Sequence, residues 1–290
     1  MTDYREHRYQ SACGQLELFA RDYPSDEPGD GPALLLMHGL TRNSADFSPL
    51  AAHLGGRYRL IVPDQRGRGL SQFDPDPANY RPDIYADDMF ALLASLGVER
   101  PGLIGTSMGG LMAMVMNAMQ PGSFPAIVFN DVGPVLDPEG LARIGSYVGG
   151  GKPLANWDAA AEACAAINGD AFPGFGEEDW QAWARRTCRE LPDGRVEFAY
   201  DPAIASGFAD VGDTPQADLW PLWDMLGETP VLALRGALSD LLTAETLAEM
   251  ERRHAGPFAS VTVAGRGHAP LLDEPQAVAA ITAFLEDHLS

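Results

Sequence analysis

The strongest constraint on the fold is a series of short apolar runs separated by segments of helix length. The runs are apolar throughout rather than alternating with polar residues, and they span residues 33–37, 59–62, 102–104, 126–129, 231–234 and 260–263. Strands that are buried on both faces of a parallel sheet have this composition. The segment from Ile84 to Leu96 has apolar residues at helical spacing. We therefore predict an α/β fold with a doubly wound, mostly parallel central sheet, preceded by a short hairpin in the first 30 residues.

This alternation fails between residues 134 and 218. No strong strand pattern recurs there, and three helical stretches, Glu139–Tyr147, Trp157–Ile167 and Glu177–Glu190, are separated by glycine and proline. We predict that residues 1–133 and 219–290 form the core and that residues 134–218 form an inserted helical cap. Aromatic side chains pack such a cap onto its core and also line apolar ligand pockets. We expect Trp157 and Trp183 to contact the substrate.

The charge of the chain excludes several classes of partner. There are 20 basic and 41 acidic side chains, a net charge of −21, and Lys152 is the only lysine. An acidic surface repels phosphate backbones and anionic lipids, so we expect neither nucleic acid nor membrane to bind. The oligomeric state is not determined by the sequence.

The cysteine pattern and the lack of long apolar segments indicate the same cellular location. Cys13, Cys164 and Cys188 are odd in number and have no metal-ligand spacing, and no apolar run approaches the length of a membrane span. The first residues have no apolar segment typical of a secretory signal. These features predict a cytoplasmic protein without a metal site.

The segment Gly105-Thr106-Ser107-Met108-Gly109 has the pattern G-x-S-x-G. It follows the predicted strand at 102–104 and opens a helix. A turn between a strand and a helix places a serine at the carboxyl edge of the sheet, with small residues beside it because the backbone passes close by. This context predicts that Ser107 is a nucleophile.

A serine nucleophile requires a general base and a carboxylate that orients the base. His268 lies in a glycine-containing loop after the last predicted strand, at the same edge of the sheet, and is the expected base. Asp240 follows the strand ending at Leu234, and Asp131 follows the strand ending at Phe129. Both loops emerge at the catalytic edge. We favour Asp240 as the acid and keep Asp131 as the alternative, which would otherwise shape the surroundings of the serine turn or a hinge of the cap.

The attack of a hydroxyl on a carbonyl creates a negative oxygen that needs two N–H donors. One is expected from Met108, the residue after the nucleophile. The other is expected from Leu40 in His38-Gly39-Leu40, where Gly39 lets the loop after residues 33–37 turn inward. We expect the His38 ring only to brace this loop through hydrogen bonds.

With loop, serine, acid and histidine in this order, the chain resembles the α/β-hydrolase superfamily over nearly its whole length. The segment from Val62 to Ser71 looks like the family's loop after the next strand, and the segment around Asp240 is similar to the acid loop of many small-molecule hydrolases. The resemblance implies Ser107 as nucleophile, Asp240 as acid, His268 as base, and the Leu40 and Met108 amides as oxyanion donors.

The resemblance also separates classes within the superfamily. Its haloalkane dehalogenases and epoxide hydrolases carry aspartate in place of Ser107. Its C–C bond hydrolases usually have asparagine where Thr106 stands, and tend to have tryptophan soon after the histidine, where this chain has Ala269-Pro270-Leu271. These differences argue against the first two classes and lower the expectation of C–C hydrolysis.

The sequence thus predicts a serine hydrolase that cleaves a small carboxylic ester or lactone, with no metal and no organic cofactor. The expected substrate is a small molecule with an apolar or aromatic acyl group. C–C bond hydrolysis, acyl transfer and thioester cleavage are the alternatives among enzymes. A small-molecule receptor of the same fold is the alternative outside them.

Overall fold

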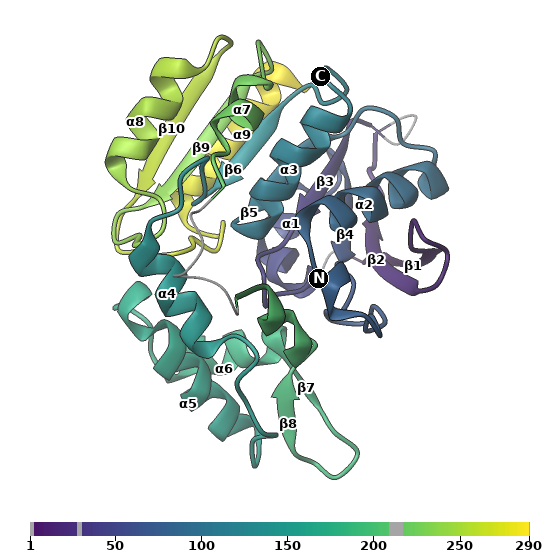
Figure 1. Ribbon diagram of the computed structural model, residues 1–290, viewed down its shortest axis with the longest axis vertical. Helices are drawn as coiled ribbons and strands as arrows, with labels where there is room; N and C mark the ends of the chain where they lie inside the picture. The colour runs from purple at the N-terminus through teal and green to yellow at the C-terminus, as the bar shows by residue number, and fades with distance from the viewer. Residues whose placement is uncertain (1–2, 28–30, 209–216, 290) are drawn as a thin grey trace.

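The central element is an eight-stranded sheet in the order β1-β2-β4-β3-β5-β6-β9-β10 (Figure 1). The computed structural model describes residues 3–27, 31–208 and 217–289. The strands are β1 (Arg5–Gln10), β2 (Glu17–Tyr23), β3 (Ala33–Met37), β4 (Arg59–Asp64), β5 (Gly102–Thr106), β6 (Ile127–Asn130), β9 (Val231–Gly236) and β10 (Phe258–Val263). β1 pairs antiparallel with β2, and β2 antiparallel with β4, whereas all the other pairs are parallel. The predicted hairpin, the six predicted strands and the fold class are confirmed.

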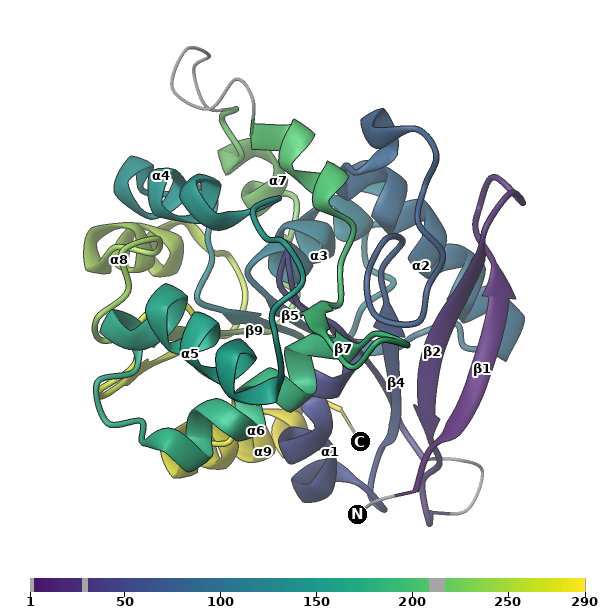
Figure 2. The same cartoon turned by 90° about the horizontal axis from the view of Figure 1, so that it is seen from below.

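Helices cover both faces of this sheet (Figure 2). One face carries α2 (Pro82–Leu96), α3 (Met108–Met119), α7 (Trp220–Asp224) and α8 (Ala244–Arg253), and the other carries α1 (Ser48–Leu54) and α9 (Pro275–His288). α2 shows why the sequence forms these helices: it begins with Pro82 in its first turn and ends at Gly97, whose φ of 66° only glycine adopts easily.

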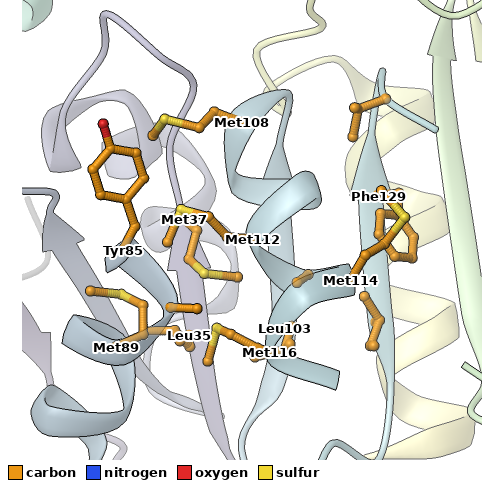
Figure 3. Packing of buried hydrophobic residues seen from close by; sticks show 14 of the residues in the cluster. Leu35, Met37, Tyr85, Met89, Leu103, Met108, Met112, Met114, Met116 and Phe129 are labelled. Atoms are coloured by element: carbon orange, nitrogen blue, oxygen red, sulfur yellow. The ribbon is translucent and has the colours of Figure 1, made fainter. Parts of the chain in front are cut away.

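The core on the α2–α3 face is rich in methionine. Met37, Met89, Met112 and Met116 are fully buried and come from β3, α2 and α3 (Figure 3). Unbranched thioether side chains fill irregular gaps between helices and sheet. This packing fixes the start of α3, and therefore Ser107, relative to the neighbouring strands.

The loop after β4 carries a buried ion-pair network. The Arg66 guanidinium donates to Asp88 at 2.7 Å and to Asp74 at 2.6 Å, and all three side chains are buried. Hydrogen bonds and opposite charges offset the cost of removing these groups from water. The network ties the loop to α2.

Between β6 and β9, the described part of the chain adds no strand to the central sheet. We call residues 138–208 the insert: it contains α4 (Pro138–Tyr147), α5 (Trp157–Asn168), α6 (Glu177–Thr187), β7 (Cys188–Glu190), β8 (Val196–Phe198) and a 3-10 helix (Pro202–Phe208). Figure 1 shows it as a separate layer next to the central sheet. Its α5, α6 and hairpin enclose a small apolar cluster of their own, which includes Phe172, Trp180 and Trp183.

Two expectations for this segment are corrected. The helix expected to reach Glu190 ends at Thr187, and the segment expected to lack strands contains the antiparallel pair β7–β8. The reason is local: Gly194 adopts a φ of 83° in the turn, and Arg189 pairs with Glu197 across the two strands at 2.7 Å. Within the described residues, no helix is long and apolar enough to cross a bilayer.

Candidate active site

Ser107 occupies the sharp turn between β5 and α3. Its φ of 52° and ψ of −116° lie in a region that residues with a side chain rarely adopt. The two glycines of the motif are required by close approach of backbone. A Cβ on Gly109 would lie 2.0 Å from the Met37 carbonyl oxygen, and one on Gly105 would lie 2.4 Å from the Gly109 carbonyl oxygen. The predicted strand–turn–helix context of Ser107 is confirmed.

His268 follows β10 and hydrogen-bonds to two side chains. Its Nε2 lies 2.8 Å from the Ser107 Oγ, and its Nδ1 lies 2.8 Å from the Asp131 Oδ2. An ionised carboxylate only accepts hydrogen bonds, so Nδ1 carries the proton and Nε2 of the neutral ring accepts from the serine hydroxyl. Ser107, His268 and Asp131 therefore form a continuous series of hydrogen bonds.

The carboxylate beside His268 is thus Asp131, and the expectation for Asp240 is wrong on this geometry. Asp240 is instead held by Arg143 of α4, whose Nη2 donates to its Oδ1 at 2.9 Å. Burial alone raises the pKa of the Asp240 carboxyl, but the hydrogen bond and charge of Arg143 outweigh burial and hold the pKa below its ordinary value. Asp240 is an anion in an ion pair at the base of the insert.

Asp131 follows β6 with a φ of 57°, and its side chain is fully buried. Its Oδ1 accepts from the Gly236 amide at 2.7 Å, and its Oδ2 accepts from the Ser239 hydroxyl at 2.6 Å as well as from His268. Three donors stabilise the ionised form and fix its orientation.

Gly236, the last residue of β9, and Ser239, in the loop where the acid was expected, were both missed by the sequence analysis. Ser239 in turn accepts from the Leu241 and Leu242 amides at 3.2 and 3.1 Å. The end of β9 and the loop after it therefore supply the donors of the acid rather than the acid itself. A serine one position before Asp240 was the only signal in the sequence, and serine is common in turns for other reasons.

His38 closes the other side of the site and is fully buried. Its Nδ1 pairs with the Gly39 carbonyl at 2.7 Å, and its Nε2 accepts from the Gln65 amide at 3.1 Å. Burial lowers the pKa of His38 to about 4, so the ring is neutral at ordinary pH. These contacts fit the expectation that the ring braces the loop.

The residues expected to supply oxyanion donors are both held by one arginine. Arg68 is fully buried, and its Nε donates to the Leu40 carbonyl at 2.9 Å, while its Nη2 lies 3.6 Å from the Met108 sulfur. Within the described chain, neither the Leu40 nor the Met108 amide donates a hydrogen bond to protein. Both N–H groups are therefore free to donate to a ligand oxygen. Sequence reasoning did not single out Arg68.

A cavity of about 950 Å³, including the part that opens to solvent, lies over Ser107 between the sheet edge and the insert. The sheet side contributes Leu40, Ser107 and His268. The insert and the loop after β3 contribute residues that no spacing in the sequence could identify: Arg42, Asp46, Tyr147, Asn168, Thr187, Phe198 and Tyr200.

The two tryptophans expected to contact substrate differ. Trp183 lines the cavity, whereas Trp157 does not. The Trp157 Nε1 donates to Glu190 at 2.9 Å, and the Arg185 guanidinium stacks 3.8 Å from its ring centre. The expectation for Trp157 is corrected: it begins α5, where it is half-buried against the insert's own apolar cluster and does not line the cavity.

The described residues contain no group of three or more His, Cys, Asp or Glu side chains that could hold a metal ion.

Comparison with known proteins places this geometry in a family. The model of the alpha/beta hydrolase family matches residues 34–281. The chain is 35% identical over 271 residues to the 3-hydroxybutyrate-oligomer hydrolase of Cupriavidus necator, covering 89% of each chain. It is 30% identical over 261 residues to the 2-(acetamidomethylene)succinate hydrolase of Mesorhizobium japonicum, covering 90% of each chain.

Solved structures agree. An alpha/beta hydrolase from Novosphingobium aromaticivorans superposes with a TM-score of 0.91 at 44% identity, covering 99% of both chains. The family model spans the parallel strands of the sheet, the serine turn and the histidine loop together. This chain therefore belongs to the alpha/beta hydrolase family and shares its hydrolase fold.

Proposed function

We propose that this protein hydrolyses a short ester of a hydroxycarboxylic acid, with Ser107 as nucleophile, His268 as general base and Asp131 as the acid of a catalytic triad. The observation that carries the proposal is the pair of 2.8 Å hydrogen bonds that His268 makes to Ser107 and Asp131. An exposed cavity over a strained serine has no packing purpose, and strain of this kind is concentrated at functional sites.

In the first half-reaction the Ser107 Oγ attacks the ester carbonyl carbon while its proton passes to the His268 Nε2. The buried Asp131 carboxylate stabilises the imidazolium that forms. The carbonyl oxygen becomes negative and accepts from the Leu40 and Met108 amides. Collapse of this intermediate transfers the proton from His268 to the alcohol oxygen, which leaves, and the acyl group remains on Ser107.

In the second half-reaction a water molecule replaces the alcohol. His268 takes a proton from the water as its oxygen attacks the acyl carbon, and the same two amides stabilise the oxyanion. The acid leaves and the proton returns to the Ser107 Oγ. The cycle consumes one ester and one water and releases one acid and one alcohol.

The substrate class rests on the relatives. The 35%-identical protein is named for 3-hydroxybutyrate oligomers, in which ester bonds join hydroxy acids and a carboxylate ends the chain. The mixed lining of the cavity suits such a molecule, because Phe198 and Trp183 contact methyl and methylene groups while Asn168, Thr187 and Tyr147 offer hydrogen bonds. This support favours a short, polar ester over the apolar or aromatic acyl group expected from the sequence.

A second candidate is hydrolysis of a substituted succinate. The 30%-identical relative is named for 2-(acetamidomethylene)succinate, and a solved structure of such a hydrolase superposes with a TM-score of 0.82 at 28% identity. That substrate also carries carboxylates, but its reaction does not begin at a simple ester.

The test is to incubate wild-type protein and Ser107→Ala with the 3-hydroxybutyrate dimer and trimer, with p-nitrophenyl esters from acetate to decanoate, and with 2-(acetamidomethylene)succinate. Products are separated by chromatography. We expect the wild type to release 3-hydroxybutyrate and to prefer short acyl chains, and Ser107→Ala to lose at least about 10⁴-fold in kcat. A fluorophosphonate probe should add to Ser107 in the wild type, seen by mass spectrometry, and not to the variant.

Each other outcome has a definite meaning. Turnover of the succinate alone selects the second candidate. Transfer of the acyl group to an added alcohol in preference to water would make the protein an acyltransferase. Probe labelling of Ser107 without turnover of any ester would contradict the proposed function. Equal activity of Ser107→Ala and the wild type would contradict the triad.

A further inference from the structure

The cavity over Ser107 contains one permanent cation among its described lining residues, Arg42. We propose that the Arg42 guanidinium binds a carboxylate carried by the substrate and so makes the enzyme selective for acidic esters. The inference rests on the proposed function and extends it, because it assigns the residue that selects the substrate.

Arg42 lies close to the nucleophile. A Cβ on Gly39 would contact the Arg42 Cγ at 3.5 Å and the Ser107 Cβ at 3.7 Å. The Arg42 amide also donates to the Gly39 carbonyl at 3.1 Å, so the side chain leaves the same turn that presents Leu40. A carboxylate a few bonds from the scissile carbonyl is therefore within reach of the guanidinium while the carbonyl lies at Ser107.

The contacts of Arg42 hold the guanidinium in place but leave part of it available. Its Nη2 donates to the Asp46 Oδ1 at 2.6 Å, and its Nε lies 2.5 Å from the Asp46 Oδ2. Its Cζ lies 4.0 Å from the centre of the Trp183 ring. Within the described residues, Nη1 has no hydrogen-bond partner. A guanidinium fixed along one edge and one face offers its remaining donors without further loss of side-chain freedom.

Arg42 is not the only cation whose charge acts near Asp46. Arg186 of α6 makes no ion pair within the described chain and has a buried Nε without a hydrogen-bond partner, and the charges of Asp46 and Arg42 act on it. Burial is the largest effect on the pKa of Arg186 and lowers it, and the positive charge of Arg42 lowers it further. The negative charges of Asp46 and, to a smaller extent, Asp273 raise the pKa. Among the described residues that line the cavity, Asp46 is the only carboxylate, and the charges of Arg42 and Arg186 both act near it.

Arg42 also acts across the cavity. Burial raises the pKa of Tyr147 on α4, and the positive charge of Arg143, followed by that of Arg42, opposes this effect. The guanidinium thus lies near both walls between which a substrate would fit.

The test compares two substrates that differ only in charge: 3-(3-hydroxybutanoyloxy)butanoate and its primary amide, each with one ester bond. We expect the wild type to prefer the carboxylate by at least about tenfold in kcat/KM, the lower range for a charge-assisted hydrogen bond. Arg42→Met should bring the ratio of the two kcat/KM values to about one, and Arg42→Lys should restore part of it. Arg252→Met, an exposed change on α8, is the matched control and should keep the wild-type ratio.

Asp46→Asn separates recognition from a structural role, because it removes the partner of Arg42 while keeping the guanidinium. We expect this variant to keep or increase the preference for the carboxylate. If Arg42 only holds the loop, Asp46→Asn and Arg42→Met should each lower kcat/KM for both substrates equally.

Two results would overturn the inference: a wild type that does not distinguish the two substrates, or an Arg42→Met that keeps the preference. Either result leaves the proposed ester hydrolysis intact. Hydrolysis of the ester bond in the uncharged primary-amide substrate measures the activity of the triad without a contribution from carboxylate binding at Arg42. Failure of the proposed function would appear instead as no hydrolysis of either ester by the wild type.

Discussion

The two walls of the cavity are built in different ways. The sheet wall carries Ser107, His268 and Asp131 on loops that leave β5, β10 and β6, and these side chains are joined by hydrogen bonds of 2.8 Å. The insert wall carries Trp183, Phe198 and Tyr200 on α6, β8 and the segment that follows, where apolar and aromatic contacts predominate.

This difference indicates that the sheet wall positions the reacting groups and that the insert wall recognises the substrate. Chemistry requires reacting groups to be positioned within a fraction of an ångström, which loops anchored at the ends of hydrogen-bonded parallel strands provide. Substrate recognition tolerates a less rigid wall, because a small displacement of one lining side chain weakens binding without removing a reacting group. Changes in the sheet wall should therefore lower kcat, and changes in the insert wall should chiefly alter KM and selectivity.

The largest expected effect distinguishes two carboxylates. Asp131→Asn should lower kcat by about 10³–10⁴-fold, because the amide no longer stabilises the imidazolium or fixes its tautomer. Asp240→Asn should change kcat less than about tenfold, since this residue contacts Arg143 and not His268. Both are measured by steady-state kinetics on protein whose fold is checked by circular dichroism. A greater loss of kcat in Asp240→Asn than in Asp131→Asn would contradict the assignment of Asp131 as the acid.

A smaller effect is expected from Arg68, which belongs to the sheet wall without touching the triad. Arg68→Met removes the hydrogen bond to the Leu40 carbonyl and should lower kcat by about 10²-fold with little change in KM, by misplacing an oxyanion donor. The measurement is kcat per mole of folded enzyme, counted by titration with the fluorophosphonate probe. An unchanged kcat would show that Leu40 does not depend on Arg68.

His38 makes the sheet wall sensitive to acid. Its pKa is about 4 in the folded state and about 6.5 unfolded, so between these values the unfolded chain binds more protons and stability falls as pH falls. From pH 7 to pH 5 this residue should cost about 2 kcal/mol of unfolding free energy. Urea unfolding at both pH values should show a smaller loss in His38→Gln, whose amide can replace both hydrogen bonds. An equal loss in both proteins would assign the acid sensitivity to other groups.

The smallest effect compares two tryptophans of the insert. Trp183→Phe should raise KM about three- to tenfold with kcat nearly unchanged, because it alters the cavity lining and the surface on which Arg42 stacks. Trp157→Phe should leave both constants as they are, since Trp157 lies outside the cavity. A fall in kcat for Trp183→Phe would mean that the insert wall also positions the reacting groups.

Much of the sheet wall could be predicted from sequence because its signals are local. Continuous apolar runs identify the strands, and two glycines beside Ser107 are required by contacts with the backbone of the same turn and of β3. His268 was found because the loop after the last strand must emerge at the same edge as the serine turn.

The sequence contains no comparable local signal for the residues of the insert wall. Trp157 and Trp183 both lie on amphipathic helices, and only the packing of α5 on α6 decides that one faces the cavity and the other pairs with Glu190 and Arg185. The hairpin β7–β8 is too short for a two-residue period to be recognised.

By itself the sequence determined the order of strands and helices, the strained serine turn and the edge at which the histidine emerges. Only the tertiary structure decided between Asp131 and Asp240. Both follow neighbouring parallel strands, so spacing places both at the catalytic edge. The choice depends on the left-handed turn at Asp131, on donors from Gly236 and Ser239, and on Arg143 of the insert, which pairs with Asp240 from 97 positions away. Contacts between distant segments fix side-chain directions that no local pattern encodes.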